Sequence, residues 1–138
     1  MANAIYPKFK EAVLQHTANS SLGGAGATGV YAALIDTGAY TYSAAHEFYS
    51  SVVAGQLGTE IELGTKTFVD GLFDAADATF AGFTSVNAEA LVIFIKNAGA
   101  NTTWRLVAYF DTGVTGLPVL PNGSPIDVAW NASGIFQL

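Results

Sequence analysis

Apolar and polar residues alternate along much of the chain after residue 30, and turn-forming residues interrupt the alternation every few positions. Alternation with a period of two is typical of strands, and frequent turns favour antiparallel pairing between them. The pattern predicts ten strands, at residues 30–35, 60–63, 66–69, 72–73, 78–83, 90–96, 103–110, 119–120, 126–130 and 135–138.

The pattern before residue 30 is different. Pro7 is well placed to open a helix because its missing N–H would be unpaired at that position. A helix over residues 7–16 puts Phe9, Ala12, Val13 and His16 on one stripe. Residues 17–29 are nearly all Ala, Ser, Thr, Asn and Gly, which predicts a flexible link. A second short helix is predicted over residues 43–51, with Ser43 as its N-cap.

Turn signals indicate how the strands are connected. Asp70-Gly71 is a two-residue hairpin signal, since both positions tolerate positive φ, and residues 121–124 form a similar signal. Residues 90–95 are apolar on both faces, as expected for a central strand. The sequence therefore predicts an all-β fold, an antiparallel β-sandwich or jelly-roll-like domain at residues 30–138, preceded by an N-terminal arm with a short helix at residues 1–29.

The composition of the chain adds an expectation that the folded domain associates with a partner. The chain of 138 residues has 51% apolar residues, five basic residues and eleven acidic residues. A monomer of this mass exposes roughly 6,800 Å², or about one charge per 425 Å². Uncharged patches of about 400 Å² already act as association sites. We therefore expect the protein to bury surface against other copies of itself or against another partner.

The same numbers exclude several partners. The net charge is −6 and the five basic residues are scattered, so binding to nucleic acid or to an anionic membrane is not expected. The longest apolar run, residues 90–95, is far too short to span a bilayer. The N-terminus lacks the pattern of a secretory signal, and without cysteine neither a disulfide nor a thiolate metal site can form.

The strongest enzymatic signal is the triplet Asp-Thr-Gly, which occurs at residues 36–38 and 111–113. Aspartic peptidases place such a triplet after an apolar strand so that two carboxylates share a proton. Residues 33–39 resemble the retroviral-type motif. That enzyme also needs two aliphatic residues followed by Gly late in the chain, and residues 132–138 reverse this order. Asp and Gly are also favoured in tight turns, so we expect no enzymatic activity.

Other candidate chemistry is weaker. His16 and His46 have no metal-ligand spacing. Asp70, Asp74 and Asp77 could hold calcium or could be solvated turn carboxylates, and their spacing is not that of an EF-hand. No cofactor and no metal are expected.

Aromatic and apolar side chains in the arm and turns are the candidate interface residues, since a flat ring contributes much contact area at small entropic cost. The candidates are Tyr6, Phe9, Val13, Tyr40, Tyr42 and Trp104.

Residues 35–48 and 105–119 resemble small virion structural proteins of tailed bacteriophages, and so do the segment Ala4-Ile5-Tyr6-Pro7-Lys8 and the turn Pro121-Asn122-Gly123. The resemblance covers most of the chain and includes no catalytic signature. It implies a capsid decoration or cement protein, which commonly sits as a trimer on the outside of the head.

These inferences predict a structural protein that is made in the host cytoplasm and is located on the outer surface of the capsid. Its expected partners are the major capsid protein and other copies of itself. Deletion of residues 1–29 is expected to leave a folded β domain that no longer assembles. A tail or head fibre component that binds a host surface through Tyr40-Thr41-Tyr42 remains an alternative, and a retroviral-type peptidase is a remote one.

Overall fold

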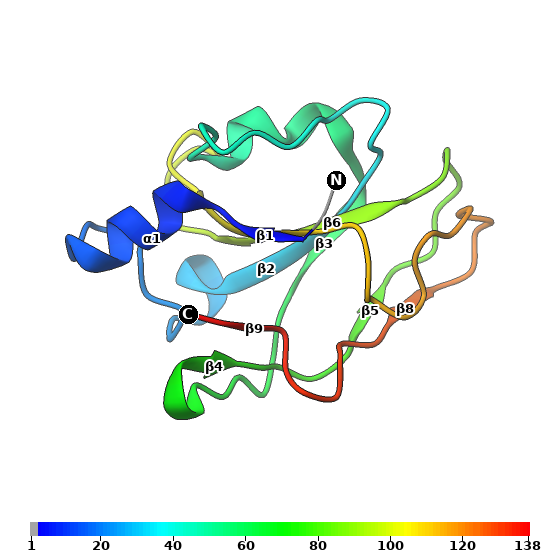
Figure 1. Ribbon diagram of the computed structural model, residues 1–138. Coiled ribbons are helices and arrows are strands. Elements are labelled where there is room, and N and C mark those ends of the chain that lie inside the picture. The colour runs from blue at the N-terminus through cyan, green and yellow to red at the C-terminus, as the bar shows by residue number, and fades with distance from the viewer. Residues whose placement is uncertain (1–2) are drawn as a thin grey trace.

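An antiparallel sheet of five strands forms the centre of the computed structural model, which describes residues 3–138 (Figure 1). Its strands lie in the order β1 (Ala4–Ile5), β7 (Arg105–Phe110), β6 (Ala90–Ile95), β2 (Val30–Ile35) and β3 (Gln56–Glu62). Two small antiparallel pairs accompany it, β4 (Leu72–Phe73) with β9 (Phe136–Gln137) and β5 (Ala78–Phe80) with β8 (Ile126–Val128). The described chain has one α-helix, α1 (Pro7–Leu14). The expected all-β class is confirmed.

The central strands are buried on both faces, as predicted for residues 90–95. Every residue of β6 and β7 is buried, and so is every residue of β2 except Tyr31. Residues 36–55 lie over one face, while the β4–β9 and β5–β8 pairs lie on the other side of the sheet (Figure 1). On the first face the ring of Tyr49 stacks on that of Phe94, with centroids 4.0 Å apart. On the other, Phe110 meets Trp130 edge to face at 6.4 Å.

Two predicted strands do not form. Residues 66–69 and 119–120 contribute only the isolated bridges Thr67↔Asp74 and Ala88↔Val119. The chain turns at Asp70 and Gly71, which have the positive φ angles expected, 53° and 79°. The predicted two-residue hairpin does not form, because β4 pairs with β9 and only the bridge Thr67↔Asp74 joins the two segments. Residues 67–71 are exposed and have no neighbouring strand to extend the ladder.

Strand β3 begins four residues earlier than predicted, at Gln56. Its first half, Gln-Leu-Gly-Thr, lacks an alternating pattern because the register shifts where it pairs with β2. Gly58 has a φ of +67° here, and a Cβ on it would lie 2.6 Å from the ring of Phe83. An irregular edge strand of this kind leaves no clear periodicity in the sequence.

The helix predicted over residues 43–51 is wrong. This segment consists of turns that end in a 3-10 turn at Tyr49–Ser51. Its backbone bonds to β7 and the residue before it: Tyr49 N donates to Trp104 O at 2.8 Å, and Glu47 O accepts from Leu106 N at 3.0 Å. Since these groups serve the sheet, they are not available for helical hydrogen bonds.

The separation into an arm and a β domain does not describe how the core is built. Strand β1 pairs with β7, and Tyr6 N donates to Val107 O at 2.9 Å. Tyr6 and Phe9 have 0% and 1% of their surface exposed. A chain without residues 1–29 would therefore lose an edge strand and two large core side chains, so the expectation of a folded truncated domain is not supported.

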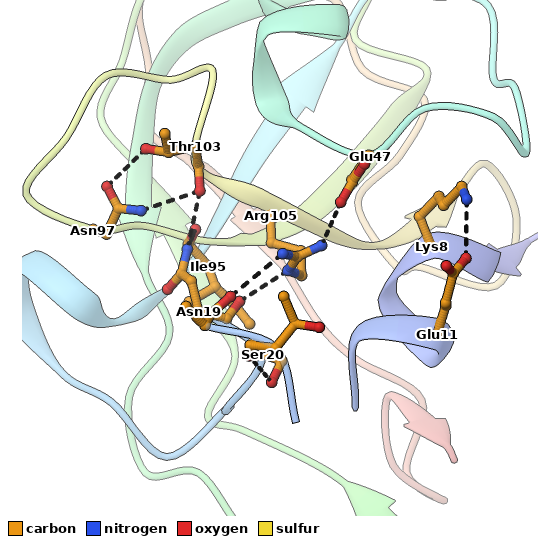
Figure 2. A network of polar contacts seen from close by, with 11 residues as sticks. Lys8, Glu11, Asn19, Ser20, Glu47, Ile95, Asn97, Thr103 and Arg105 are labelled. Carbon is orange, nitrogen blue, oxygen red and sulfur yellow. Dashed lines mark hydrogen bonds and ion pairs between the residues drawn. The ribbon is translucent and has the colours of Figure 1, made fainter. Parts of the chain in front are cut away.

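Residues 18 and 19 are also held against the sheet, because a buried arginine bonds to their backbone carbonyl groups. Arg105 is 4% exposed and donates to the carbonyl oxygens of Asn19 (3.2 Å) and Ala18 (3.3 Å). Its Nη1 donates to Glu47 Oε1 at 2.9 Å, and its guanidinium lies 5.2 Å from the ring centre of Phe48. Figure 2 shows Arg105 between Asn19 and Glu47. One side chain thus joins β7, the N-terminal segment and the cover over the sheet.

We expect Arg105→Met to lower the free energy of unfolding by about 2–3 kcal/mol, because it removes the charged hydrogen bonds that a buried guanidinium donates to two backbone carbonyl groups and to Glu47. Urea unfolding followed by fluorescence measures this. Lys8→Met is the matched control, since the Lys8–Glu11 ion pair is exposed and should contribute little. Similar losses in both variants would contradict the anchoring role of Arg105.

Helix α1 ends in a Schellman motif that has a histidine where glycine is favoured. Thr17 N donates to Ala12 O at 2.9 Å, His16 N donates to Val13 O at 3.2 Å, and His16 has a φ of 53°. A side chain in this left-handed conformation is strained, whereas glycine is not.

The motif predicts that His16→Gly raises the free energy of unfolding by about 0.5–1 kcal/mol. Gln15→Gly should lower it by a similar amount, because Gln15 has ordinary right-handed geometry, with a φ of −88°. Thermal unfolding of both variants measures the sign of each change in stability. A His16→Gly protein less stable than the unchanged protein would show that His16 is not strained.

Candidate functional site

The six predicted interface residues have separate places in the structure. Tyr6 and Phe9 are core residues, which corrects their assignment to an interface. Tyr40 is also buried, at 4% exposed. Tyr42 and Trp104 are half-buried over the sheet, and Val13 is half-buried on α1.

Trp104 covers the sheet and holds the loop before β7. Its ring lies nearly parallel to that of Phe94, with centroids 5.9 Å apart, and the ammonium of Lys96 is 4.6 Å from its ring centre. Its Nε1 donates to Gly99 O at 3.0 Å. These contacts are all within the chain, so they give Trp104 a structural role.

Val13 lines an apolar groove, and the sequence pattern did not indicate that the residues of this groove lie together. We define the apolar groove by the large apolar side chains among its lining residues: Phe9, Val13, Leu22, Phe68, Leu72, Phe73, Phe136 and Leu138. It comprises two adjoining hollows of about 340 and 160 Å³, which share Leu22, Phe68 and Leu138. Phe68 and Leu138 have 48% and 54% of their surface exposed.

Core aromatics form the base of the groove and hold its walls. Phe68 stacks on Phe73 with centroids 5.7 Å apart, and Phe73 contacts Phe136 at 5.2 Å. The Asp70-Gly71 turn carries Phe68 to this position, and β9 pairs with β4 beside it. The lone leucine at position 22, in a stretch of small residues, was the available sequence signal.

A second site lies where three strands meet the loop after β2. We call it the tyrosine pocket: a hollow of about 360 Å³ lined by Thr37, Tyr40, Thr41, Tyr42, Glu89, Tyr109, Asp111 and Pro118. A hydrogen-bond chain supports its wall, since the hydroxyl groups of Tyr6 and Tyr40 are 2.8 Å apart and that of Tyr40 is 3.0 Å from His46 Nδ1. The sequence predicted Tyr40 and Tyr42 as a pair but did not predict Glu89 or Tyr109.

The electrostatics of this pocket are negative. Thr37 donates to Glu89 Oε2 from its hydroxyl (2.7 Å) and its backbone N–H (2.9 Å), and these bonds lower the pKa of Glu89. Burial, together with the charges of Asp111 and Glu89, raises the pKa of Tyr109 to about 12. Burial also raises the pKa of Tyr40 and of Tyr42. At neutral pH the pocket therefore holds the ionised carboxylate of Glu89 beside protonated tyrosines.

The two Asp-Thr-Gly triplets form turns at one edge of the sheet. Asp36 Oδ1 accepts from Gly38 N at 2.7 Å, as in a turn stabilised by its own side chain. Asp111 lies in the turn after β7, where its backbone N–H donates to Asn3 Oδ1 at 2.9 Å. Strand β6 lies between β2 and β7, so the strands that precede the triplets are about 10 Å apart. Within one chain this geometry does not form a carboxylate pair that shares a proton.

The remaining candidate ligands have local partners. Asp74 Oδ1 accepts from Ala75 N at 2.9 Å, and Asp77 Oδ1 accepts from Trp130 N at 3.0 Å. Over residues 3–138 no group of three His, Asp or Glu side chains is arranged to hold a metal ion.

Comparisons with known proteins identify no relative of this chain. No family model matches the chain, and no curated protein or solved structure shows significant similarity to it. Among residues 3–138 no helix has the length and apolar character needed to cross a bilayer.

The bonds to Glu89 predict an acid-sensitive contribution to stability. Because its pKa in the folded state lies below the ordinary value of 4.5, this contribution is complete above pH 4.5 and is lost as the pH falls through the lower, folded-state pKa. Glu89→Gln should therefore make unfolding less dependent on pH between pH 5 and about 3. Urea unfolding at a series of pH values measures it.

Thr37→Val is the companion variant, because it removes the side-chain hydroxyl that donates to Glu89 and keeps the backbone N–H donor. It should reduce the same pH dependence in part. Unchanged acid dependence in both variants would rule out this role of Glu89.

Proposed function

We propose that this chain is a structural virion protein of a tailed bacteriophage, a decoration or cement protein that strengthens the head shell through contacts between subunits. The observation that carries the proposal is the apolar groove, which leaves Phe68 and Leu138 half exposed in a chain with 16 charged residues. Exposed apolar hollows of this kind are typical of surfaces that bind another protein. The resemblance in sequence supports the particle as its setting.

The proposed mechanism is mechanical. Covering the groove with a side chain of the major capsid protein or of another copy removes apolar surface from water, which stabilises the contact by about 25 cal/mol per Å². Each contact can be modest, since symmetric repetition over a closed shell makes the binding multivalent. A trimer on the outer surface of the capsid, assembled from subunits made in the host cytoplasm, is the arrangement we propose.

The proposed architecture is a β-sandwich in which the central sheet is one layer and the β4–β9 and β5–β8 pairs are the other. The double burial of β2 and β6 supports it, because a sheet that is apolar on both faces needs a layer over each.

A fibre component that binds a host surface is the second candidate. The tyrosine pocket supports it, because Thr41 is exposed beside the half-buried ring of Tyr42, in the segment from which such contact was expected.

The experiment is cosedimentation of purified protein with empty expanded heads. Phe68→Glu should reduce the bound fraction at least tenfold, because a charge in the groove must lose its water when the contact forms. Val86→Glu is the matched control, since Val86 is 55% exposed and does not line the groove. Circular dichroism should show that both variants are folded.

Full binding of Phe68→Glu would overturn the role of the groove. Absence of binding by the unchanged protein, together with binding to intact host cells, would favour the fibre candidate.

A further inference from the structure

The apolar groove lies between two elements that are far apart in sequence. Helix α1 lines one side through Phe9 and Val13, and the turn at residues 68–72 lines the other. Figure 1 shows α1, β4 and β9 on the same side of the molecule. Seven large apolar side chains of residues 3–138 are exposed, and four of them line the groove or adjoin a lining residue in sequence: Leu14, Phe68, Val69 and Leu138.

The periodicity of α1 places Lys10 and Leu14 beside the groove. Successive residues of a helix are turned by about 100°, so the order around α1 is Ala12, Phe9, Val13, Lys10, Leu14. Burial follows the same order: Ala12 and Phe9 are buried, Val13 is half-buried, Lys10 is exposed and Leu14 is 87% exposed. Lys10 and Leu14 therefore continue the α1 side of the groove into solvent, and we call them the helix rim.

Two charged side chains at the groove have no partner within the chain. Among residues 3–138, every charged side chain except those of Lys10 and Asp70 interacts with another group of the chain. Asp70 is exposed and lies next to Gly71, which lines the groove. Val69 and Asp70 form the turn rim, opposite the helix rim. Each rim thus has one exposed apolar side chain and one unpaired charge, and the two charges are of opposite sign.

We propose that the apolar groove binds a second copy of this chain through a two-fold contact. Such a contact places the same surface of both copies face to face, so the surface must complement itself. With the helix rim of each copy against the turn rim of the other, Lys10 pairs with Asp70 twice, and Leu14 is buried twice. This inference rests on the groove being a contact surface, as in the proposed function, and commits the groove to one occupant.

Charge complementarity is the argument for a second copy. Opposite charges across an interface fix its register and orientation, whereas like charges oppose the wrong arrangement. In a parallel alignment of the two copies, Lys10 would face Lys10 and Asp70 would face Asp70. The two-fold alignment replaces both repulsive pairs with attractive ones, and the exposed apolar residues at the groove lose water in the same step.

The size and symmetry of this contact define its place in an assembly. The groove and its rims have fewer residues than the 20–30 a side of a standard interface, so we expect a dissociation constant on the order of 10–100 µM. A two-fold contact cannot close a trimer. In the proposed particle it links a subunit of one trimer to a subunit of the next, and repetition over the shell strengthens it.

The first test is sedimentation equilibrium of the purified full chain, over concentrations that bracket the expected dissociation constant. We expect a reversible doubling of the mass of the smallest species. Leu14→Ser should weaken this association about tenfold, because it removes an apolar side chain from the contact. Val86→Ser is the matched control and should leave the association unchanged, since Val86 is 55% exposed and does not line the groove.

Charge reversal then tests which rims meet. Lys10→Glu alone places like charges together at both ends of the contact, and so does Asp70→Lys alone, so each should weaken the association at least tenfold. A 1:1 mixture of the two variants restores both attractive pairs and should associate about as strongly as the unchanged protein. Lys8→Glu makes the same change in charge on the other flank of α1 and should have no effect.

A second variant covers the case in which Asp70→Lys does not fold. Asp70 has a φ of 53°, a conformation that asparagine adopts more readily than lysine. Asp70→Asn then takes its place, and its mixture with Lys10→Glu has one attractive pair and no repulsive one. This mixture should associate more strongly than Lys10→Glu alone.

Absence of any association by the unchanged protein would overturn the proposal, and so would equal weakening by Lys10→Glu and Lys8→Glu. A mixture that associates no more strongly than its components would overturn the two-fold pairing. Loss of head binding by Phe68→Glu in either case would show that the groove binds the major capsid protein, and the proposed function would stand. Conversely, self-association as expected, with full head binding by Phe68→Glu, would support the two-fold contact and contradict the proposed function.

Discussion

The central sheet is apolar on both of its faces, and the rest of the structure depends on covering it. All six residues of β6 are buried, so neither face of this strand can meet water. Burial of each large aliphatic or aromatic side chain stabilises the fold by about 1.5–3 kcal/mol, which favours any segment that can provide cover. Residues 36–55 supply one cover, while the β4–β9 and β5–β8 pairs supply the other (Figure 1). The N-terminal segment completes the enclosure with Tyr6 and Phe9.

Polar contacts decide where these covers attach. Arg105 projects from the central sheet and reaches both the N-terminal segment and the loop that carries Glu47 (Figure 2). Asn19 adds to the same anchor, since its side-chain amide donates to Ile95 O and Thr103 O, at 3.1 and 3.2 Å. Apolar burial has no preferred direction, whereas these hydrogen bonds do. They therefore explain how a segment of small polar residues has one defined path.

Two surfaces remain after the sheet has been covered, and they differ in chemistry. The apolar groove lies where α1, the 68–72 turn and the C-terminal strand meet over Phe73, and the tyrosine pocket lies where β2 and β7 end. The groove presents apolar side chains, whereas the tyrosine pocket presents tyrosines and the carboxylate of Glu89.

The sequence by itself determined the local elements. Alternating and continuous apolar runs bounded by turn residues predicted the all-β class and β2, β6 and β7. Pro7 marked the start of α1, and Asp70-Gly71 marked the turn before β4. Each of these signals depends only on neighbouring residues. Tertiary structure decided the rest. Residues 43–51 are not helical because their backbone bonds to β7, and Arg105 joins residues separated from it by 58 to 87 positions. The tyrosine pocket likewise required the direction of β2 and β7, and the groove required contact between residues from position 13 to 138. Such contacts depend on which surfaces pack together across the whole chain, and local periodicity carries no record of that choice.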